Sequence, residues 1–165
     1  MTASQLASMS SCRVAVTREV LDFLEYQAAR ASKHEVGGII AGSGSVEEGL
    51  VVVWRASDAG PAASSTPASF SRDTPHCQAL LDGWAAESFG RIDYLGEWHK
   101  HFESDPSPSR RDLSTLASIA QDHAYHVTVP ILFIIGQSNN RSSLRVFLVD
   151  AEGCCAATDW GVREE

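Results

Sequence analysis

Lysine is nearly absent from this chain of 165 residues, in which only Lys33 and Lys100 occur. Lysine and arginine together number 13 against 21 acidic residues, so the formal net charge is −8. The basic residues are scattered along the chain. Because binding of nucleic-acid phosphates needs a basic face, we expect no nucleic acid among the partners.

Cysteine pairs with metal-binding spacing are also missing. The four cysteines are Cys12, Cys77, Cys154 and Cys155, with no C-x-x-C pair among them. This pattern indicates thiols of a reducing compartment rather than a disulfide framework. It also excludes a zinc deaminase, which needs a P-C-x-x-C ligand pair. A cysteine hydrolase that uses Cys77 with His76 is a weak alternative, because Cys77 falls on the inner face of a predicted helix.

Long apolar runs are absent as well, and none approaches the roughly 20 residues that cross a bilayer. The first dozen residues lack the basic start and apolar centre of a secretory signal. We therefore expect a cytoplasmic protein with no membrane partner. A hydrophobic fraction of 44% and a charged fraction of 21% predict one globular domain over residues 1–165.

Short apolar runs and helical periodicities alternate along the chain. Strands are predicted over residues 13–16, 36–42, 50–54, 92–98, 130–136 and 143–149. Helices are predicted to begin at the capping residues Thr17, Thr74 and Ser109. Gly37 and Gly38 predict that a second backbone comes close to their strand, and the residues from Ala151 onward are expected to be peripheral. Alternation with hairpins predicts an α/β fold in which helices flank a mixed sheet.

The stretch from Leu95 to Asp112 carries the chemistry of the chain. His99 and His101 lie one residue apart at the end of a predicted strand, where alternate side chains share a face. A Pro-rich loop follows, and Ser109 then opens a predicted helix that includes Asp112. Two neutral imidazoles and one carboxylate are a common ligand set for a catalytic zinc, with a fourth position left to water. The sequence therefore predicts a metal-dependent hydrolase.

Some of these residues also have ordinary structural explanations. Ser109 and Asp112 precede an apolar helical face and fit a capping box. Capping and metal binding are compatible, because an aspartate on the first helical turn is rigidly aimed. Glu35, just before Gly37 and Gly38, would on its own be a solvated charge at a strand edge.

Together these residues resemble the JAMM motif of the JAB/MPN family of zinc metallopeptidases. The matching features are His99-x-His101, seven further residues, Ser109-x-x-Asp112, and the upstream Glu35. The surroundings at 94–99 and 106–109 are most similar to the prokaryotic JAB branch. The resemblance implies a single JAB/MPN-like domain with a cytidine deaminase-like α/β fold.

The resemblance also implies a role for each residue. Zn²⁺ would be bound by His99, His101 and Asp112, with Glu35 as the general base and Ser109 as the hydrogen-bond donor to the oxyanion.

Two positions depart from the family pattern. Phe102 replaces the proline that usually follows the second histidine and rigidifies the loop. Lys100 replaces a small residue between the histidines, and by strand alternation its side chain should face away from the metal.

Relatives of this kind cleave isopeptide or peptide bonds after the C-terminal tail of ubiquitin-like proteins. Short prokaryotic forms resemble enzymes of antiphage operons that release a conjugated protein, such as a cGAS-like nucleotidyltransferase, so conjugation enzymes of the same pathway are possible partners. In the family, the segment that matches Ser57 to Asp73 clamps the substrate tail by strand addition; its composition fits a surface loop equally well. A non-catalytic MPN scaffold is the alternative function.

Overall fold

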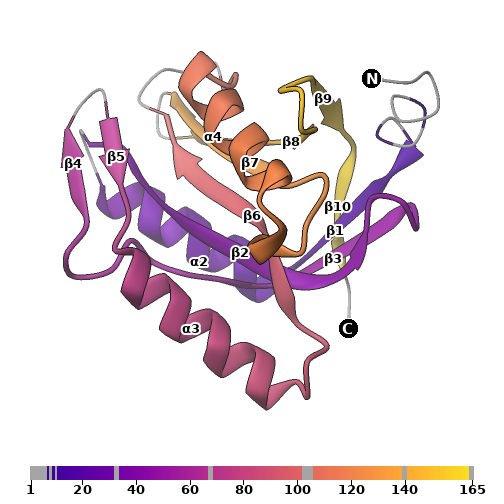
Figure 1. Cartoon of the computed structure of the whole chain (residues 1–165). Coiled ribbons are helices and arrows are strands. Elements are labelled where there is room, and N and C mark those ends of the chain that lie inside the picture. The colour runs from indigo at the N-terminus through magenta and orange to yellow at the C-terminus, as the bar shows by residue number, and fades with distance from the viewer. Residues whose placement is uncertain are drawn as a thin grey trace.

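The main feature of the computed structural model is an eight-stranded mixed sheet (Figure 1). The structure describes residues 7, 9, 11–31, 34–66, 69–101, 106–138 and 141–163. The strand order is β10-β1-β3-β2-β6-β7-β8-β9. The strands are β1 (Arg13–Thr17), β2 (Val36–Ser45), β3 (Leu50–Ala56), β6 (Asp93–Lys100), β7 (Ile131–Ser138), β8 (Arg141–Val149), β9 (Cys155–Thr158) and β10 (Trp160–Arg163). The pairs β1–β10, β1–β3 and β6–β7 are parallel and the other pairs antiparallel. The predicted mixed sheet is confirmed.

The helices of the described residues are α2 (Arg18–Arg30), α3 (Thr74–Glu87), α4 (Arg110–Gln121) and the short 3₁₀ helix η1 (His123–Tyr125). Thr17 and Ser109 cap α2 and α4, as predicted. For α3 the predicted cap, Thr74, was wrong by one residue. The carboxylate of Asp73 accepts the N–H of His76 at 3.2 Å and that of Ala62 at 3.0 Å. An ionised acceptor binds backbone N–H groups more strongly than a hydroxyl does, which explains the choice.

Both faces of the main sheet are buried. Along β7, Ile131, Phe133 and Ile135 belong to one apolar cluster, whereas Leu132 and Ile134 belong to another. Helix α2 packs on the first cluster, and α3 and α4 pack on the second. Because both faces need apolar side chains, this strand has a continuous apolar run rather than an alternating pattern.

The two glycines of β2 confirm the predicted close approach of a second backbone. A Cβ on Gly38 would lie 2.4 Å from the carbonyl oxygen of Ser57, and a Cβ on Gly37 would lie 2.4 Å from that of Trp98. Only glycine leaves room for these neighbours.

The C-terminal strands join the two edges of the sheet. Strand β9 pairs with β8 and strand β10 pairs with β1, although only Asp159 separates them. The Trp160 indole N–H donates to the Leu144 carbonyl at 3.3 Å, across the same junction. The residues from Ala151 onward are peripheral as expected, since none of residues 151–163 is buried, but the two edge strands that they form were not predicted. These strands are only four residues long, too short for a periodic signal.

The segment from Ser57 to Asp73 contains a hairpin of β4 (Ser64–Thr66) and β5 (Ser69–Ser71), which the prediction of a plain loop missed. Three-residue strands rich in serine and threonine carry no apolar alternation that would reveal them. The N–H of Asp73 donates to the carbonyl of Ala59 at 2.9 Å and fixes the base of the segment.

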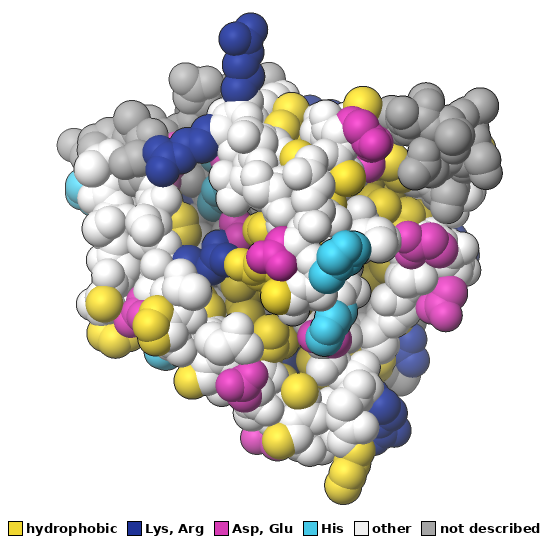
Figure 2. All heavy atoms as spheres, viewed as in Figure 1, with side chains coloured by type: hydrophobic (Ala, Val, Ile, Leu, Met, Phe, Trp, Pro, Cys, Tyr) yellow, Lys and Arg dark blue, Asp and Glu magenta, His cyan; other side chains and the backbone are white. Residues whose placement is uncertain are grey.

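Charged side chains of both signs are interspersed with apolar ones on the face shown in Figure 2. No helix in the described part of the chain combines the length and apolar character needed to cross a membrane. Phe102 lies outside the described residues.

Candidate active site

Strand β6 and the residue that follows it present both histidines on one face of the sheet. It lies between β2 and β7, with His99 opposite Gly37 on one side and Ile134 on the other. The N–H of His101 still donates to the Ile135 carbonyl at 2.9 Å, just beyond the end of the strand. Because the backbone is held on both sides, the two imidazoles are aimed by a rigid element.

Helix α4 brings Asp112 to the histidines. Ser109 Oγ accepts the N–H of Asp112 at 3.2 Å, and Asp112 Oδ2 accepts the N–H of Ser109 at 2.7 Å. These two bonds make the predicted capping box. They fix the carboxylate at the first turn of the helix, so the capping box leaves Asp112 aimed at the histidines.

The three side chains converge on one point. His99 Nε2 lies 3.7 Å from Asp112 Oδ1, and His101 Nε2 lies 3.4 Å from Asp112 Oδ2. One ligand atom from each residue falls within 4.8 Å of the others. His99 Nε2 is buried and has no hydrogen-bond partner among the residues that the structure describes. A buried nitrogen of this kind costs folding free energy unless another group binds it. Two imidazoles, one of them with a nitrogen that has no hydrogen bond, and a carboxylate fit a divalent metal ion such as zinc.

Protonation favours metal binding as well. Burial lowers the pKa of His99 to about 4, so its imidazole is neutral near pH 7 and can donate a lone pair. Burial acts to raise the pKa of Asp112, but the hydrogen bond with His101, the charge of His99 and the Ser109 bonds hold that pKa well below its usual range. A neutral histidine and an ionised aspartate are the forms that bind metals.

Glu35 directly precedes Val36, whose strand partner is Lys100, the residue between the two histidines. Burial raises the pKa of its carboxyl group; the charges of His101 and Arg111 oppose the shift, and that of Asp112 adds to it. These interactions place Glu35 within electrostatic range of the cluster. A raised carboxyl pKa suits proton transfer near neutral pH.

The β4–β5 hairpin stands beside the same strand and supplies residues that sequence reasoning missed. Phe70 Cε1 lies 3.1 Å from the position of a Cβ on Gly37, which pairs with His99. Arg72, just after β5, forms an ion pair with Glu97 on β6. Glu97 could have been found, because it precedes His99 by two residues and shares its face. Arg72 had no comparable signal.

The weak cysteine-hydrolase candidate finds no support in the geometry. Cys77 is 2% exposed and packs in the apolar cluster under α3. His76 Nε2 instead contacts Asp58 Oδ1 at 2.6 Å. The imidazole therefore contacts a carboxylate rather than the thiol, and the thiol is buried, as expected for a structural cysteine.

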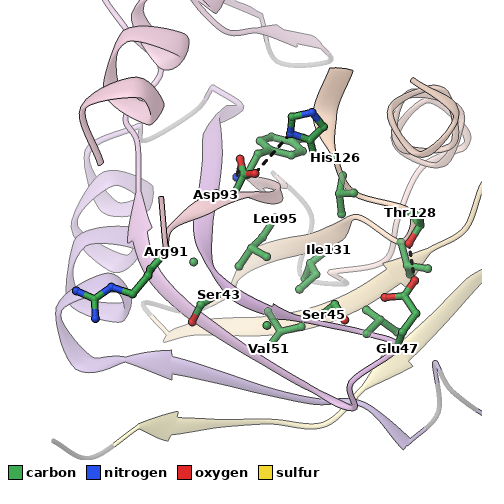
Figure 3. Close-up of a pocket in the computed structure, with 16 residues that line it drawn as sticks. Ser43, Ser45, Glu47, Val51, Arg91, Asp93, Leu95, His126, Thr128 and Ile131 are labelled. Carbon is green, nitrogen blue, oxygen red and sulfur yellow. Dashed lines mark hydrogen bonds and ion pairs between the residues drawn. The ribbon is translucent and has the colours of Figure 1, made fainter. Parts of the chain in front are cut away.

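A cavity of about 260 Å³ lies elsewhere, between the β2–β3 turn and the segment before β7. Figure 3 shows its apolar floor of Val51, Leu95 and Ile131, with Asp93 and His126 on one side and Glu47 and Thr128 on the other. The cavity shares no residue with the His–His–Asp cluster.

An α/β domain with a His–His–Asp cluster and an adjacent carboxylate defines a protein with a candidate metal centre of the hydrolase type. The chain belongs to the family of prokaryotic homologues of the JAB domain, which matches residues 17–148.

Two proteins similar to this chain were also found. A protein of Enterobacter hormaechei subsp. hoffmannii (strain UCI 50) named CD-NTase/cGAS isopeptidase is 25% identical over 124 residues, which are 74% of this chain and 67% of that protein. The solution structure of a protein from Desulfitobacterium hafniense matches with a TM-score of 0.67 and 19% identity, over 92% of this chain and 94% of that one. The structural match supports the fold alone, whereas the family and the named relative support a hydrolase.

Proposed function

We propose that this protein is a zinc-dependent isopeptidase. It would hydrolyse the bond after the C-terminal tail of a conjugated ubiquitin-like or cGAS-like nucleotidyltransferase protein. The observation that carries the proposal is the convergence of His99, His101 and Asp112 beside Glu35. The name of the Enterobacter relative supports the substrate class. We further propose one cytoplasmic domain over residues 1–165 that works in the same pathway as conjugation enzymes.

Each residue has a role that its surroundings allow. His99, His101 and Asp112 would hold the zinc ion, which when bound lowers the pKa of water and polarises a carbonyl. Glu35 would accept the proton of the attacking water and transfer it to the leaving amine. Ser109 Oγ uses a lone pair to accept the N–H of Asp112, so its hydroxyl hydrogen can donate to the oxyanion of the substrate.

Zinc analysis tests the metal site directly. We expect about one zinc per chain in protein purified without chelator, and none in His101→Ala, because three protein ligands are needed for such a site. Glu35→Gln should keep the zinc and lose cleavage of a reporter fused to the tail of a cGAS-like nucleotidyltransferase. An empty native site would instead favour the non-catalytic scaffold, and full activity of Glu35→Gln would remove its role as base.

The β4–β5 hairpin is the proposed clamp for the substrate tail. Support comes from its place beside β6, with Phe70 against Gly37 and Arg72 paired with Glu97. An extended tail could add as a strand next to it, held by main-chain hydrogen bonds. Deletion of residues 62–69 should therefore raise KM for the fusion while zinc is retained. Unchanged cleavage by the deletion variant would rule out the clamp.

A further inference from the structure

The residue between the two histidines has an unusual environment. Lys100 is only 2% exposed, and its Nζ donates a hydrogen bond to the carbonyl oxygen of Ala28 at 3.0 Å, 72 residues away in sequence. A buried ammonium group costs free energy unless it is well bonded. The last turn of α2 offers such a partner, because the carbonyl end of a helix carries partial negative charge. The side chain thus faces away from the metal ligands, as alternation predicts.

The backbone of the same residue is fixed at a second place. In the β2–β6 ladder Lys100 is the partner of Val36, the first residue of β2. Lys100 therefore contacts the chain on both sides of the segment that connects α2 with β2. Its side chain binds Ala28 in α2, and its backbone pairs with Val36 in β2. Glu35 lies in this segment, directly before Val36. The N–H of His34 donates to the carbonyl of Ala31 at 2.9 Å within it.

We propose that Lys100 is a positioning residue that sets the place of Glu35 relative to His99 and His101. The inference rests on the proposed function, in which Glu35 is the general base. Lys100 lies between the two proposed ligands, His99 and His101. It also contacts the residues on either side of the segment that contains Glu35, the proposed base. Any displacement of α2 from β6 would move the carboxylate against the metal site. A misplacement of about 1 Å can cost on the order of a hundredfold in rate, so such an anchor has a catalytic consequence.

Lys100→Met tests the proposal, because methionine has a similar length and no hydrogen-bond donor. We expect native zinc content and kcat lowered by roughly tenfold or more with little change in KM. Backbone amides of His34 and Val36 should exchange faster with solvent, in metal-free protein as well. Lys100→Arg, which keeps a donor, should recover part of kcat.

Val146→Ala is the matched control, because Val146 is buried at 1% exposure on β8, a strand that pairs with neither β2 nor β6. It should lower Tm and leave kcat unchanged at temperatures where the variant is folded. Native kcat with native amide exchange in Lys100→Met would overturn the proposal. Activity of Glu35→Gln would instead overturn the proposed function. The amide exchange rates of His34 and Val36 in Lys100→Met would still show whether Lys100 positions the segment that contains Glu35.

Discussion

His99 is the residue at which folding and function conflict in the metal-free chain. Its Nε2 atom is buried without a hydrogen-bond partner in the described part of the chain, and burial lowers its pKa to about 4. The same neutral, unpaired nitrogen is what a metal ion needs. A site prepared for a ligand therefore weakens the fold when the ligand is removed, and the weakness depends on pH.

The stability of the metal-free protein should fall as the pH is lowered below about 6.5. In that range the unfolded chain takes up a proton on His99, whereas the folded chain takes it up only near the folded-state pKa of about 4. The free energy of unfolding should drop by about 2.5 kcal/mol between pH 7.5 and 4.5, as measured by urea denaturation after chelation. His99→Gln should remove this part of the pH dependence; an equal slope in both proteins would contradict the assignment.

The placement of residues was predicted where it is local in sequence. The shared face of His99 and His101 and the Ser109–Asp112 capping box follow from spacings of two and three residues. The ion pair of Arg72 with Glu97 joins residues 25 apart, and no local pattern indicates it. Pairings of this kind become visible only when two elements are packed together.

Strand β6 is the element on which the site depends. Gly96 begins its parallel pairing with β7, and a Cβ there would lie 1.9 Å from the carbonyl oxygen of Ile131. Gly96 also has a φ of 155°, a backbone conformation that residues with a side chain rarely adopt. The histidines follow three and five residues later, so a shift at Gly96 is transmitted directly to the ligand positions.

Gly96→Ala should therefore lower Tm and weaken zinc binding together. The clash with Ile131 requires the two strands to move apart, which we expect to cost about 2 kcal/mol or more. Gly83→Ala is the matched control, because a Cβ at this helical position meets nothing within 4 Å; it should raise stability by up to about 1 kcal/mol. Thermal unfolding and zinc titration of both variants test the prediction, and a native Tm for Gly96→Ala would contradict it.

The elements themselves were predicted where they are long and strongly patterned. The helices and the six predicted strands of the main sheet are present, because their apolar side chains meet a face of the sheet at regular intervals. The β4–β5 hairpin and the strands β9 and β10 were missed. They consist of three or four residues each, and β10 pairs with β1 from the other end of the chain.

At the scale of the whole molecule, the end of the chain decides the shape of the sheet. Strand β10 completes the edge at β1, and Trp160 reaches back to Leu144 near the other edge. Partly buried Trp160 also packs against the apolar cluster that contains α2. Strands β10 and β9 cover the edges of β1 and β8, and Trp160 covers part of the apolar cluster.

Truncation of the chain after Asp159 should destabilise the entire fold. It removes the pairing of β10 with β1 and the packing of Trp160, and we expect a loss of about 2 kcal/mol or more. Val162→Ala is the control on the same strand, since Val162 is 38% exposed and should cost less than about 1 kcal/mol. Urea unfolding measures both, and equal midpoints for native and truncated protein would show that β10 is dispensable.

The sequence by itself determined the class of fold, most of the strands and helices, and the four motif residues from His99 to Asp112, because alternation, periodicity and capping act between neighbours in the chain. Only the tertiary structure decided the closure of the sheet, the ion pair of Arg72 and the contact of Lys100 with Ala28. The physical reason is distance along the chain: the last of these hydrogen bonds joins residues 72 apart. Such a contact depends on which surfaces pack together, and that choice is made by the whole core at once.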